Sequence, residues 1–162
     1  MIQIIKTNNE DELAQCAQLM CASDPWTTLN FDYERCFSAF GGDNKEIFIM
    51  TDGDSLAGFA IIQITGMLRG YIQTICFHED YRNKGLGTAL IRYCEEQIFK
   101  FSPNSFICYS SFNPAAGKLY TKLGYELVGV LDDMLVNGHS EILLHKTIGS
   151  WEDFNKGILS AN

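Results

Sequence analysis

The stretch Arg82-Asn83-Lys84-Gly85-Leu86-Gly87-Thr88 lies between an apolar run that ends at Phe77 and a helical pattern that begins near Gly85. The first backbone N–H groups of a helix lack partners and point outward, and the helix dipole adds about half a positive charge there. Two glycines let the backbone approach a pyrophosphate closely, and Arg82 and Lys84 can add side-chain charge. The stretch therefore indicates either an anion site or an ordinary strand-to-helix turn. Its spacing matches neither the dinucleotide-binding motif Gly-x-Gly-x-x-Gly nor the P-loop motif Gly-Lys-Ser/Thr.

The residue patterns on both sides of this stretch predict strands and helices in a defined order. Runs of β-branched and aromatic residues predict strands at 2–6, 46–51, 56–65, 70–77, 105–110, 125–131 and 141–147. Apolar residues at helical spacing predict helices at 10–21, 31–40 and 85–101, and Asn113-Pro114 opens a further helix that Gly124 closes. The order β-α-α-β-β-β-α-β-α-β-β predicts an α/β (α+β) fold, in which helices cover both faces of a mixed sheet of about six to seven strands.

The composition fits one domain with a buried core. Of the 162 residues, 46% are hydrophobic, and nothing marks a second domain, so we expect one domain at 1–148 and a C-terminal tail at 149–162. In the tail, Trp151, Phe154 and Ile158 stand at helical offsets, which leaves both a short amphipathic turn and a partly ordered terminus open. The six cysteines include no C-x-x-C pair and are interpreted as reduced core residues. With no signal peptide in view, we expect a cytoplasmic protein.

The charge of the chain bears on its partners. Twelve Lys and Arg against 20 Asp and Glu give a formal net charge of -8, which repels nucleic acid and anionic membrane surfaces. The apolar runs are also far shorter than the roughly 18 residues that a membrane span requires. His78, Cys16 and Cys21 have no partners at metal-ligand spacing. We therefore expect no nucleic acid, no membrane and no metal, and a cationic partner is easier to accommodate.

Two motifs together resemble those of a known superfamily. Arg-x-x-Gly-x-Gly after the strand and approach Ile75-Cys76-Phe77-His78-Glu79-Asp80-Tyr81 resembles the acyl-CoA pyrophosphate loop of the GNAT superfamily of N-acyltransferases. The segment Asn113-Pro114-Ala115-Ala116-Gly117-Lys118-Leu119-Tyr120-Thr121-Lys122-Leu123-Gly124-Tyr125 is similar to a later segment of that family, in which an Asn opens a helix and a Tyr follows seven residues on. The similarity in element order extends from about residue 2 to residue 147.

The resemblance implies a GNAT-like fold and acetyl-CoA as cosubstrate. In such a fold a mostly antiparallel sheet is splayed in the middle, here between the strand that ends at Phe77 and the strand that starts at Ser105. The pantetheine arm lies in that split, where the backbone of residues 75–77 pairs with it like an added strand. The implied cofactor-binding residues are Ile75, Cys76, Phe77, Arg82, Asn83, Lys84, Gly85, Leu86, Gly87, Thr88 and Asn113. For Asn113, a plain helix N-cap is an alternative role that is compatible with cofactor contact.

Tyr120 is the residue to which the resemblance gives a catalytic role. By spacing alone, Tyr120 lies on the same helical side as Ala116 and Leu123 and would be a buried core tyrosine. In the family, this position often donates a proton or a hydrogen bond to the departing thiolate. Since the pKa of a thiol is near 8.5 and that of a phenol near 10, full proton transfer is uphill by roughly 2 kcal/mol. Hydrogen bonding to the thiolate is therefore the larger part of the expected role.

An alkylammonium, with a pKa near 10.4, is not nucleophilic, so the acceptor must lose a proton to a general base, and the sequence does not identify that base. Many relatives carry a Glu where this chain has Gln73, and the position of another family base is Cys108; neither side chain is a good base. Glu141, His139 or a chain of waters could substitute. We nevertheless expect Glu141 to be a surface residue and His139 to be solvated in a turn, so the base is left unassigned.

These observations predict an N-acetyltransferase that transfers an acetyl group from acetyl-CoA to a primary amine by direct attack. The amine belongs to a small molecule or to a protein or peptide N-terminus. Asp24-Pro25-Trp26 lies where family members build the acceptor side of the cleft, and Trp26 is either a pocket wall or core packing. The alternative is a non-catalytic acyl-CoA-binding sensor with the same fold, and a third interpretation is an α/β domain for another phosphate ligand. The number of subunits is open, a homodimer included.

Overall fold

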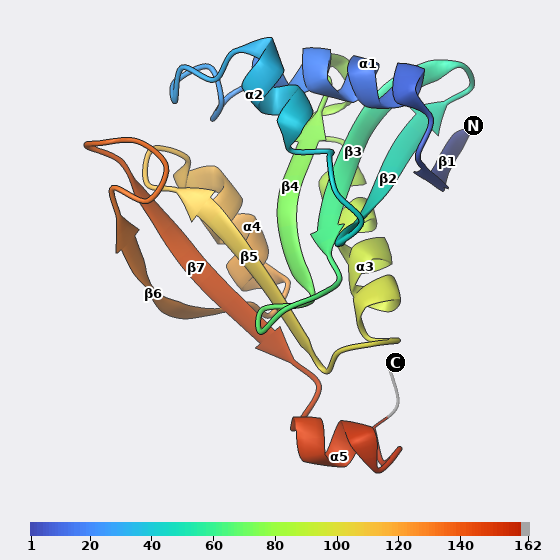
Figure 1. The fold of residues 1–162 in the computed structure, drawn as a ribbon, viewed down its shortest axis with the longest axis vertical. Coiled ribbons are helices and arrows are strands. Elements are labelled where there is room, and N and C mark those ends of the chain that lie inside the picture. Colours follow the sequence, from blue (N-terminus) through green and yellow to red (C-terminus); the bar gives the residue numbers. More distant parts are fainter. Residues whose placement is uncertain (160–162) are drawn as a thin grey trace.

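Seven strands form one sheet in the order β1-β2-β3-β4-β5-β7-β6 (Figure 1). The structure is a computed structural model and describes residues 1–159. The strands are β1 (Ile2–Thr7), β2 (Lys45–Asp52), β3 (Ser55–Gln63), β4 (Tyr71–Phe77), β5 (Asn104–Ser110), β6 (Glu126–Asp132) and β7 (Ser140–Thr147). Neighbouring strands are antiparallel, except that β4 and β5 are parallel. The predicted mixed, mostly antiparallel sheet is confirmed.

The helices follow the predicted order, with differences at their ends. They are α1 (Glu10–Cys21), α2 (Tyr33–Ser38), α3 (Leu86–Ile98), α4 (Pro114–Lys122) and α5 (Trp151–Asn155). The helix predicted at 31–40 begins later, because the Asp32 side chain accepts the Arg35 N–H and caps the first turn. The helix predicted at 85–101 ends at Ile98, whose carbonyl accepts the N–H groups of Phe101 and Ser102 in a tight turn. A short 3-10 helix, η1 (Glu79–Tyr81), was not predicted.

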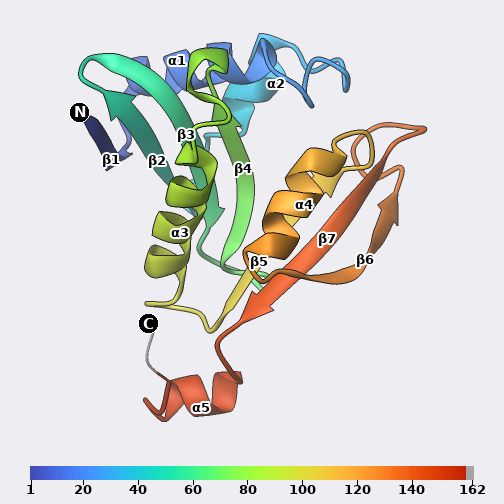
Figure 2. The same cartoon turned by 180° about the vertical axis from the view of Figure 1, so that it is seen from behind.

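Helices cover the two faces of the sheet with separate apolar clusters. α1 and α2 lie over one face, at the top of Figure 1, and α3 and α4 lie over the other, in front in Figure 2. Beneath α1 and α2, the buried side chains include Cys16, Met20, Cys36, Phe40 and Phe59. Beneath α3 and α4, they include Phe48, Ile62, Leu90, Ile107, Tyr120 and Leu144. The second cluster draws residues from both halves of the sheet and therefore links them.

The sheet is split between β4 and β5, as the diverging strands in Figure 1 show. The two strands pair only at Tyr71 with Phe106 and at Ile72 with Ile107. Just before this join, the carbonyl of Gly70 accepts the Phe106 N–H at 3.0 Å. Gly70 has a φ of 94°, and its Cα lies against the backbone of Asn104, which leaves no room for a side chain. The splayed sheet that the family resemblance implied is confirmed.

A β-bulge changes the facing of side chains along β4. Ile62 of β3 pairs with Ile72 and Ile61 pairs with Thr74, so Gln73 is the extra residue. As a result, Ile72 and Ile75 both face the cluster beneath α3 and α4, although three positions separate them. The bulge therefore stands where β4 leaves β5 and the split begins.

The C-terminal tail forms the short helix α5 below the narrow end of the split (Figure 1). The Ser150 hydroxyl accepts the Asp153 N–H and caps the helix. The guanidinium carbon of Arg69, in the β3–β4 turn, lies 4.1 Å from the centroid of the Trp151 ring. Of the two states left open for the tail, the structure shows the helical turn; positions 160–162 lie outside the described residues.

Two further observations concern the chain as a whole. All six cysteines are free, four of them are buried, and Cys21 and Cys108 are partly buried. No helix within residues 1–159 has the length and apolar character that crossing a membrane requires.

Candidate active site

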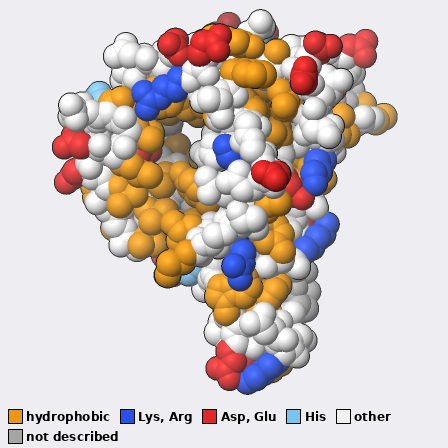
Figure 3. Space-filling view, in the orientation of Figure 1, with side chains coloured by type: hydrophobic (Ala, Val, Ile, Leu, Met, Phe, Trp, Pro, Cys, Tyr) orange, Lys and Arg blue, Asp and Glu red, His pale blue; other side chains and the backbone are white. Residues whose placement is uncertain are grey.

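Two cavities meet at the split in the sheet. The loop cavity, about 450 Å³, lies between residues 75–91 and the first turns of α4. The sheet cavity, about 340 Å³, lies between the α1–α2 segment, which is residues 22–32, and strands β4, β5 and β7. Figure 3 shows the surface hollowed there. The residues that border both cavities are Asp24, Ile75, Ala116 and Tyr120. Ligands in the two cavities can therefore meet at this shared wall.

The first turn of α3 presents unpaired backbone N–H groups at the loop cavity. Gly85 takes a left-handed φ of 77° immediately before the helix, and no side chain caps this end. The N–H of Ala89 is the first to bond back, to the Gly85 carbonyl at 3.2 Å. The N–H groups of Leu86, Gly87 and Thr88 therefore lack helical partners, and together with the helix dipole they favour an anion.

Gly87 keeps the cavity open beside these N–H groups. A Cβ at this position would lie 3.7 Å from Leu119 and 3.9 Å from Phe77, which are ordinary contact distances. The packing of the protein itself therefore does not require glycine here. The missing side chain instead leaves space for a ligand that approaches the backbone closely.

Most of the predicted cofactor-binding residues border the loop cavity. These are Ile75, Cys76, Phe77, Arg82, Asn83, Gly85, Gly87 and Thr88. Two neighbours within the stretch point elsewhere: the Lys84 ammonium lies 5.7 Å from the centroid of the Tyr81 ring, and Leu86 packs against the cluster beneath α3 and α4. For these two residues, cofactor contact stays a prediction.

The Arg82 side chain is held in place beneath the loop. Its Nε donates to the Phe77 carbonyl at 3.0 Å, and its Nη2 donates to the Ser23 hydroxyl at 3.3 Å. Ser23 is buried at the end of α1. The guanidinium therefore ties α1 to the end of β4 and fixes a positive charge at the wall of the loop cavity.

Beyond Ile72, the edge of β4 that faces β5 has backbone groups outside the sheet ladder, although the Phe77 carbonyl accepts a hydrogen bond from Arg82. No residue from Gln73 to Phe77 pairs with a strand on that side within residues 1–159. An unpaired strand edge can bind an extended ligand through main-chain hydrogen bonds. This is the geometry expected if Ile75 and Phe77 pair with the pantetheine amides.

Tyr120 is both a core residue and one of the residues that border both cavities. Only 6% of its surface is exposed, and its ring lies 6.4 Å from the rings of Tyr109 and Tyr125. The hydroxyl has no hydrogen-bond partner among residues 1–159, yet it is not sealed off from solvent. Burial raises the pKa of Tyr120, with a further contribution from Cys108. The phenol is therefore protonated and free to donate a hydrogen bond.

The sheet cavity combines an apolar wall with a few charged groups. The apolar wall belongs to the α1–α2 segment and consists of Trp26, Leu29 and Phe31. Trp26 also packs against the cluster beneath α1 and α2, so the two roles left open for it coexist. The charged residues that border this cavity are Asp24, Arg35 and Glu141.

The carboxylate of Asp24 stands at the mouth that both cavities share. Its Oδ1 accepts hydrogen bonds from the hydroxyls of Thr27 and Thr28. These bonds lower the pKa of Asp24, and Arg82 lowers it further. Asp24 is therefore a fixed negative charge at the entrance.

Glu141 corrects the expectation of a surface carboxylate. Only 6% of its surface is exposed, and its Oε1 accepts a 2.6 Å hydrogen bond from the Ser110 hydroxyl. Glu141 pairs with Ser110 in the ladder between β7 and β5, so both side chains lie on the same face of the sheet. Sequence reasoning missed Ser110 because only strand pairing brings it to Glu141; the single available signal was a Glu directly before the apolar run 142–144.

Asn113, Gln73 and Cys108 also lie at the sheet cavity. Asn113 precedes α4, but its side chain makes no capping hydrogen bond, so the plain N-cap role is not what the structure shows. Asn113 does not border the loop cavity, and its contact with the cofactor arm stays a prediction. Within the described part of the chain, no group of three or more His, Cys, Asp and Glu residues could hold a metal ion.

Comparisons with known proteins agree with this geometry. The family model described as the acetyltransferase (GNAT) family matches residues 11–125. No curated protein sequence matches the chain.

Solved structures share the fold. The ribosomal-protein-S18-alanine N-acetyltransferase from Escherichia coli is similar at 20% identity with a TM-score of 0.73, over 93% of this chain and 96% of that one. NAA60 from Arabidopsis thaliana, in complex with a bisubstrate analogue, is similar at 20% identity with a TM-score of 0.73, over 92% of this chain and 100% of that one. An aminoglycoside 6'-N-acetyltransferase complexed with coenzyme A is similar at 18% identity with a TM-score of 0.71, over 93% of this chain and 98% of that one.

The family match covers both motifs that resemble GNAT sequences, the pyrophosphate loop and the helix that carries Tyr120. The structural neighbours are too distant in sequence to show more than a shared fold. The chain therefore belongs to the GNAT family and is an acyl-CoA-dependent acetyltransferase.

Proposed function

We propose that the protein transfers the acetyl group of acetyl-CoA, held in the loop cavity, to a primary amine held in the sheet cavity. The observation that carries this proposal is that the two cavities share a wall at Tyr120. The loop cavity has the unpaired N–H groups and the positive charge that a pyrophosphate needs. The free edge of β4 leads from there toward Tyr120, as the pantetheine arm requires.

Acetyl-CoA supplies a thioester, whose carbonyl carbon accepts the lone pair of the amine. The nitrogen–carbon bond forms and the carbon–sulfur bond breaks, so the products are an acetamide and the thiol of coenzyme A. One proton leaves the amine and one proton reaches the sulfur. The shared wall positions the two reactants, which is the main contribution that a direct mechanism requires of the protein.

Direct attack is favoured over an acetyl-cysteine route by the state of the two cavity cysteines. Burial raises the pKa of Cys76 to about 11 and raises the pKa of Cys108 as well. Both side chains are therefore thiols rather than the nucleophilic thiolate at neutral pH.

Tyr120→Phe is expected to lower kcat by about 10²-fold while leaving acetyl-CoA affinity unchanged. The change removes only the hydroxyl that faces the developing thiolate. Because burial raises the pKa of Tyr120, the hydroxyl acts as a hydrogen-bond donor more than as an acid. Steady-state kinetics and a binding isotherm measure the two effects separately. Normal turnover by a folded variant would show that the donor to the thiolate lies elsewhere.

The acceptor proposed for the sheet cavity is a cationic primary amine of a small molecule or a peptide N-terminus. The net charge is -8, and when Arg82 and Lys84 of the predicted pyrophosphate loop are set aside, the rest of the chain carries 10 basic against 20 acidic residues, or -10. At the cavity itself, Asp24 and Glu141 outnumber Arg35. An amine with an apolar neighbour also suits the wall formed by Trp26, Leu29 and Phe31.

The kcat/KM for a cationic amine is expected to fall as ionic strength rises, because charge steering raises association rates by about 10- to 10³-fold at low salt. Hydroxylamine, which is neutral at pH 7, is the control and should show little salt dependence. A flat profile for the cationic amine, or a preference for an anionic acceptor, would remove the electrostatic argument.

Turnover tests the proposal itself. Acetyl-CoA consumption is measured with a panel that contains 2-phenylethylamine, spermidine and short peptides with free N-termini. The proposal expects release of the coenzyme A thiol with at least one of these amines. The alternative of a non-catalytic sensor expects acetyl-CoA binding without turnover of any of them.

A further inference from the structure

Two carboxylates are buried within residues 1–159, and only one of them has a cationic partner. Glu95 binds the Lys146 ammonium through both oxygens, each at 2.9 Å. Glu141 forms no ion pair with a Lys, Arg or His in the described part of the chain; its side chain bonds there to the Ser110 hydroxyl alone. Burying a carboxylate without a cation costs several kcal/mol. Glu141 therefore has an environment that stability alone does not explain.

The free oxygen of Glu141 is open to the sheet cavity. Oε1 is occupied by Ser110, whereas Oε2 accepts no hydrogen bond from residues 1–159. Among residues 1–159, no fully buried side-chain oxygen or nitrogen lacks a hydrogen-bond partner, so Oε2 is not fully enclosed in the protein. Since Glu141 borders the sheet cavity, this oxygen is available to a ligand there.

Tyr120 borders the same cavity and also faces the loop cavity. An amine in the sheet cavity therefore stands between a hydrogen-bond donor beside the departing sulfur and a carboxylate on the strand side. This is the arrangement that amine acylation needs, because one side must stabilise the thiolate while the other removes a proton from nitrogen.

We propose that Glu141 is the general base that accepts the proton of the attacking amine, directly or through one water, and that Ser110 is the residue that positions it. The inference rests on the proposed function. The ammonium first passes one proton to Oε2 of Glu141, which leaves the N–H electron pair on nitrogen, free to attack the carbonyl carbon; Glu141 later releases this proton to solvent. As the nitrogen–carbon bond forms, the sulfur leaves with the carbon–sulfur pair, accepts a hydrogen bond from Tyr120 and takes up the second proton that the nitrogen loses, which gives the thiol.

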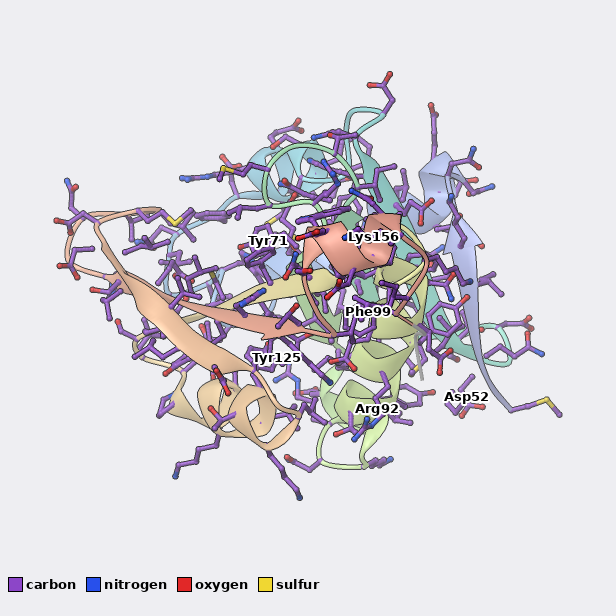
Figure 4. The ribbon with its side chains drawn as sticks, turned by 90° about the horizontal axis from the view of Figure 1, so that it is seen from below. Asp52, Tyr71, Arg92, Phe99, Tyr125 and Lys156 are labelled. Carbon is purple, nitrogen blue, oxygen red and sulfur yellow. The ribbon has the colours of Figure 1, made fainter. Side chains whose placement is uncertain are left out.

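The surroundings of Glu141 tune it for this role. Burial raises the pKa of Glu141, while the hydrogen bond from Ser110 and the proximity of His139 oppose the rise. A carboxylate with a raised pKa is a stronger base, and it is closer in acidity to the amine. Asp132 of β6 pairs with Ser140 and so lies on the opposite face of the sheet from Glu141. The other titratable or charged groups that border the sheet cavity come from β4, β5, α4, α2 and the chain after α1: Tyr71 (labelled in Figure 4), Cys108, Tyr109, Tyr120, Arg35 and Asp24.

Glu141→Gln keeps the shape and the bond to Ser110 but cannot accept a proton. With the panel amine that gives the highest kcat/KM, the variant is expected to lose about 10²- to 10⁴-fold in kcat at pH 7. Its acetyl-CoA affinity should be unchanged, because Glu141 does not border the loop cavity.

The pH profile separates a base from a residue that merely holds the cavity in shape. A base must be ionised, so wild-type kcat/KM is expected to rise with pH through the pKa of Glu141 and then level off. We call this rise of kcat/KM at low pH the acid limb of the profile. In Glu141→Gln the acid limb should vanish, and kcat/KM should instead increase with the fraction of uncharged amine up toward the pKa of the amine. Hydroxylamine, already neutral at pH 7, should be affected much less than the alkylamine.

Ser110→Ala is the matched control. Its hydroxyl stabilises the ionised form of Glu141, so its removal raises that pKa and is expected to move the acid limb to higher pH while turnover persists. A Glu141→Gln variant that binds acetyl-CoA, but keeps the wild-type pH profile or loses equally with both acceptors, would overturn the inference and leave the proposed function intact. A wild-type chain that acetylates no amine would overturn both.

Discussion

Gly70→Ala is expected to lower the free energy of unfolding by about 2 to 5 kcal/mol, since a left-handed residue with a side chain costs about 1–2 kcal/mol and overpacking about 1–3 kcal/mol. Gly70 has a φ of 94°. An added Cβ would strike the backbone carbonyl of Asn104 and would lie 2.9 Å from Cγ2 of Ile98. Backbone cannot move aside as a flexible side chain can, so the clash would force apart the short join between β4 and β5. Urea denaturation measures the change.

Gly66→Ala is the matched control for Gly70→Ala. Gly66 also has a positive φ, of 86°, but nothing lies within 4 Å of an added Cβ. Its substitution should cost only the left-handed conformation, about 1–2 kcal/mol. Equal losses in the two variants would mean that the chain at Gly70 yields easily and that the join is not closely packed.

Gly87→Glu is expected to abolish the stabilisation that acetyl-CoA gives, which at one hundred times Kd amounts to about 2.7 kcal/mol. The side chain would extend into the loop cavity beside the unpaired N–H groups of α3 and bring a negative charge to the place proposed for the pyrophosphate. The melting temperature is measured with and without acetyl-CoA.

Gly87→Ala provides the control, because a Cβ at this position meets only ordinary contacts in the protein. Both variants should therefore fold, and the alanine variant should keep most of the ligand-induced rise in melting temperature. If the folded Gly87→Glu variant shows the full rise, the anion site is not at the start of α3.

Local patterns predicted the order of the elements well, because each signal lies within a few residues. The start of α4 at Asn113-Pro114 and its end before Gly124 are examples. The bulge at Gln73 could not be predicted, since it depends on how β4 pairs with β3. Simple alternation would put Ile72 and Ile75 on opposite faces, whereas the bulge brings both to the cluster beneath α3 and α4.

In the candidate site, features that depend on the local backbone could be read from the sequence. The orientation and burial of side chains could not, because they depend on contacts between residues far apart in the chain. From sequence alone, the glycines and the helix start at 85–88 left both an anion site and an ordinary strand-to-helix turn open, and the structure adds the unpaired N–H groups beside a cavity. The orientation of the Arg82 guanidinium depends on Ser23, 59 positions away. The burial of Glu141 depends on its pairing with Ser110 and on the cover of the α1–α2 segment, so a Glu in the sequence resembled any surface carboxylate.

The two-pair join between β4 and β5 bears on the mechanics of the molecule. A long hydrogen-bonded ladder resists bending, but here the halves are held mainly by the apolar cluster beneath α3 and α4, whose packed side chains can slide past one another. This seam has two residue pairs, whereas every other pair of neighbouring strands has six or more, so it has the fewest ladder bonds to resist shear. Tyr120 lies on α4 and borders both cavities, so a rotation of β5, β6, β7 and α4 about the join would change the width of both cavities together.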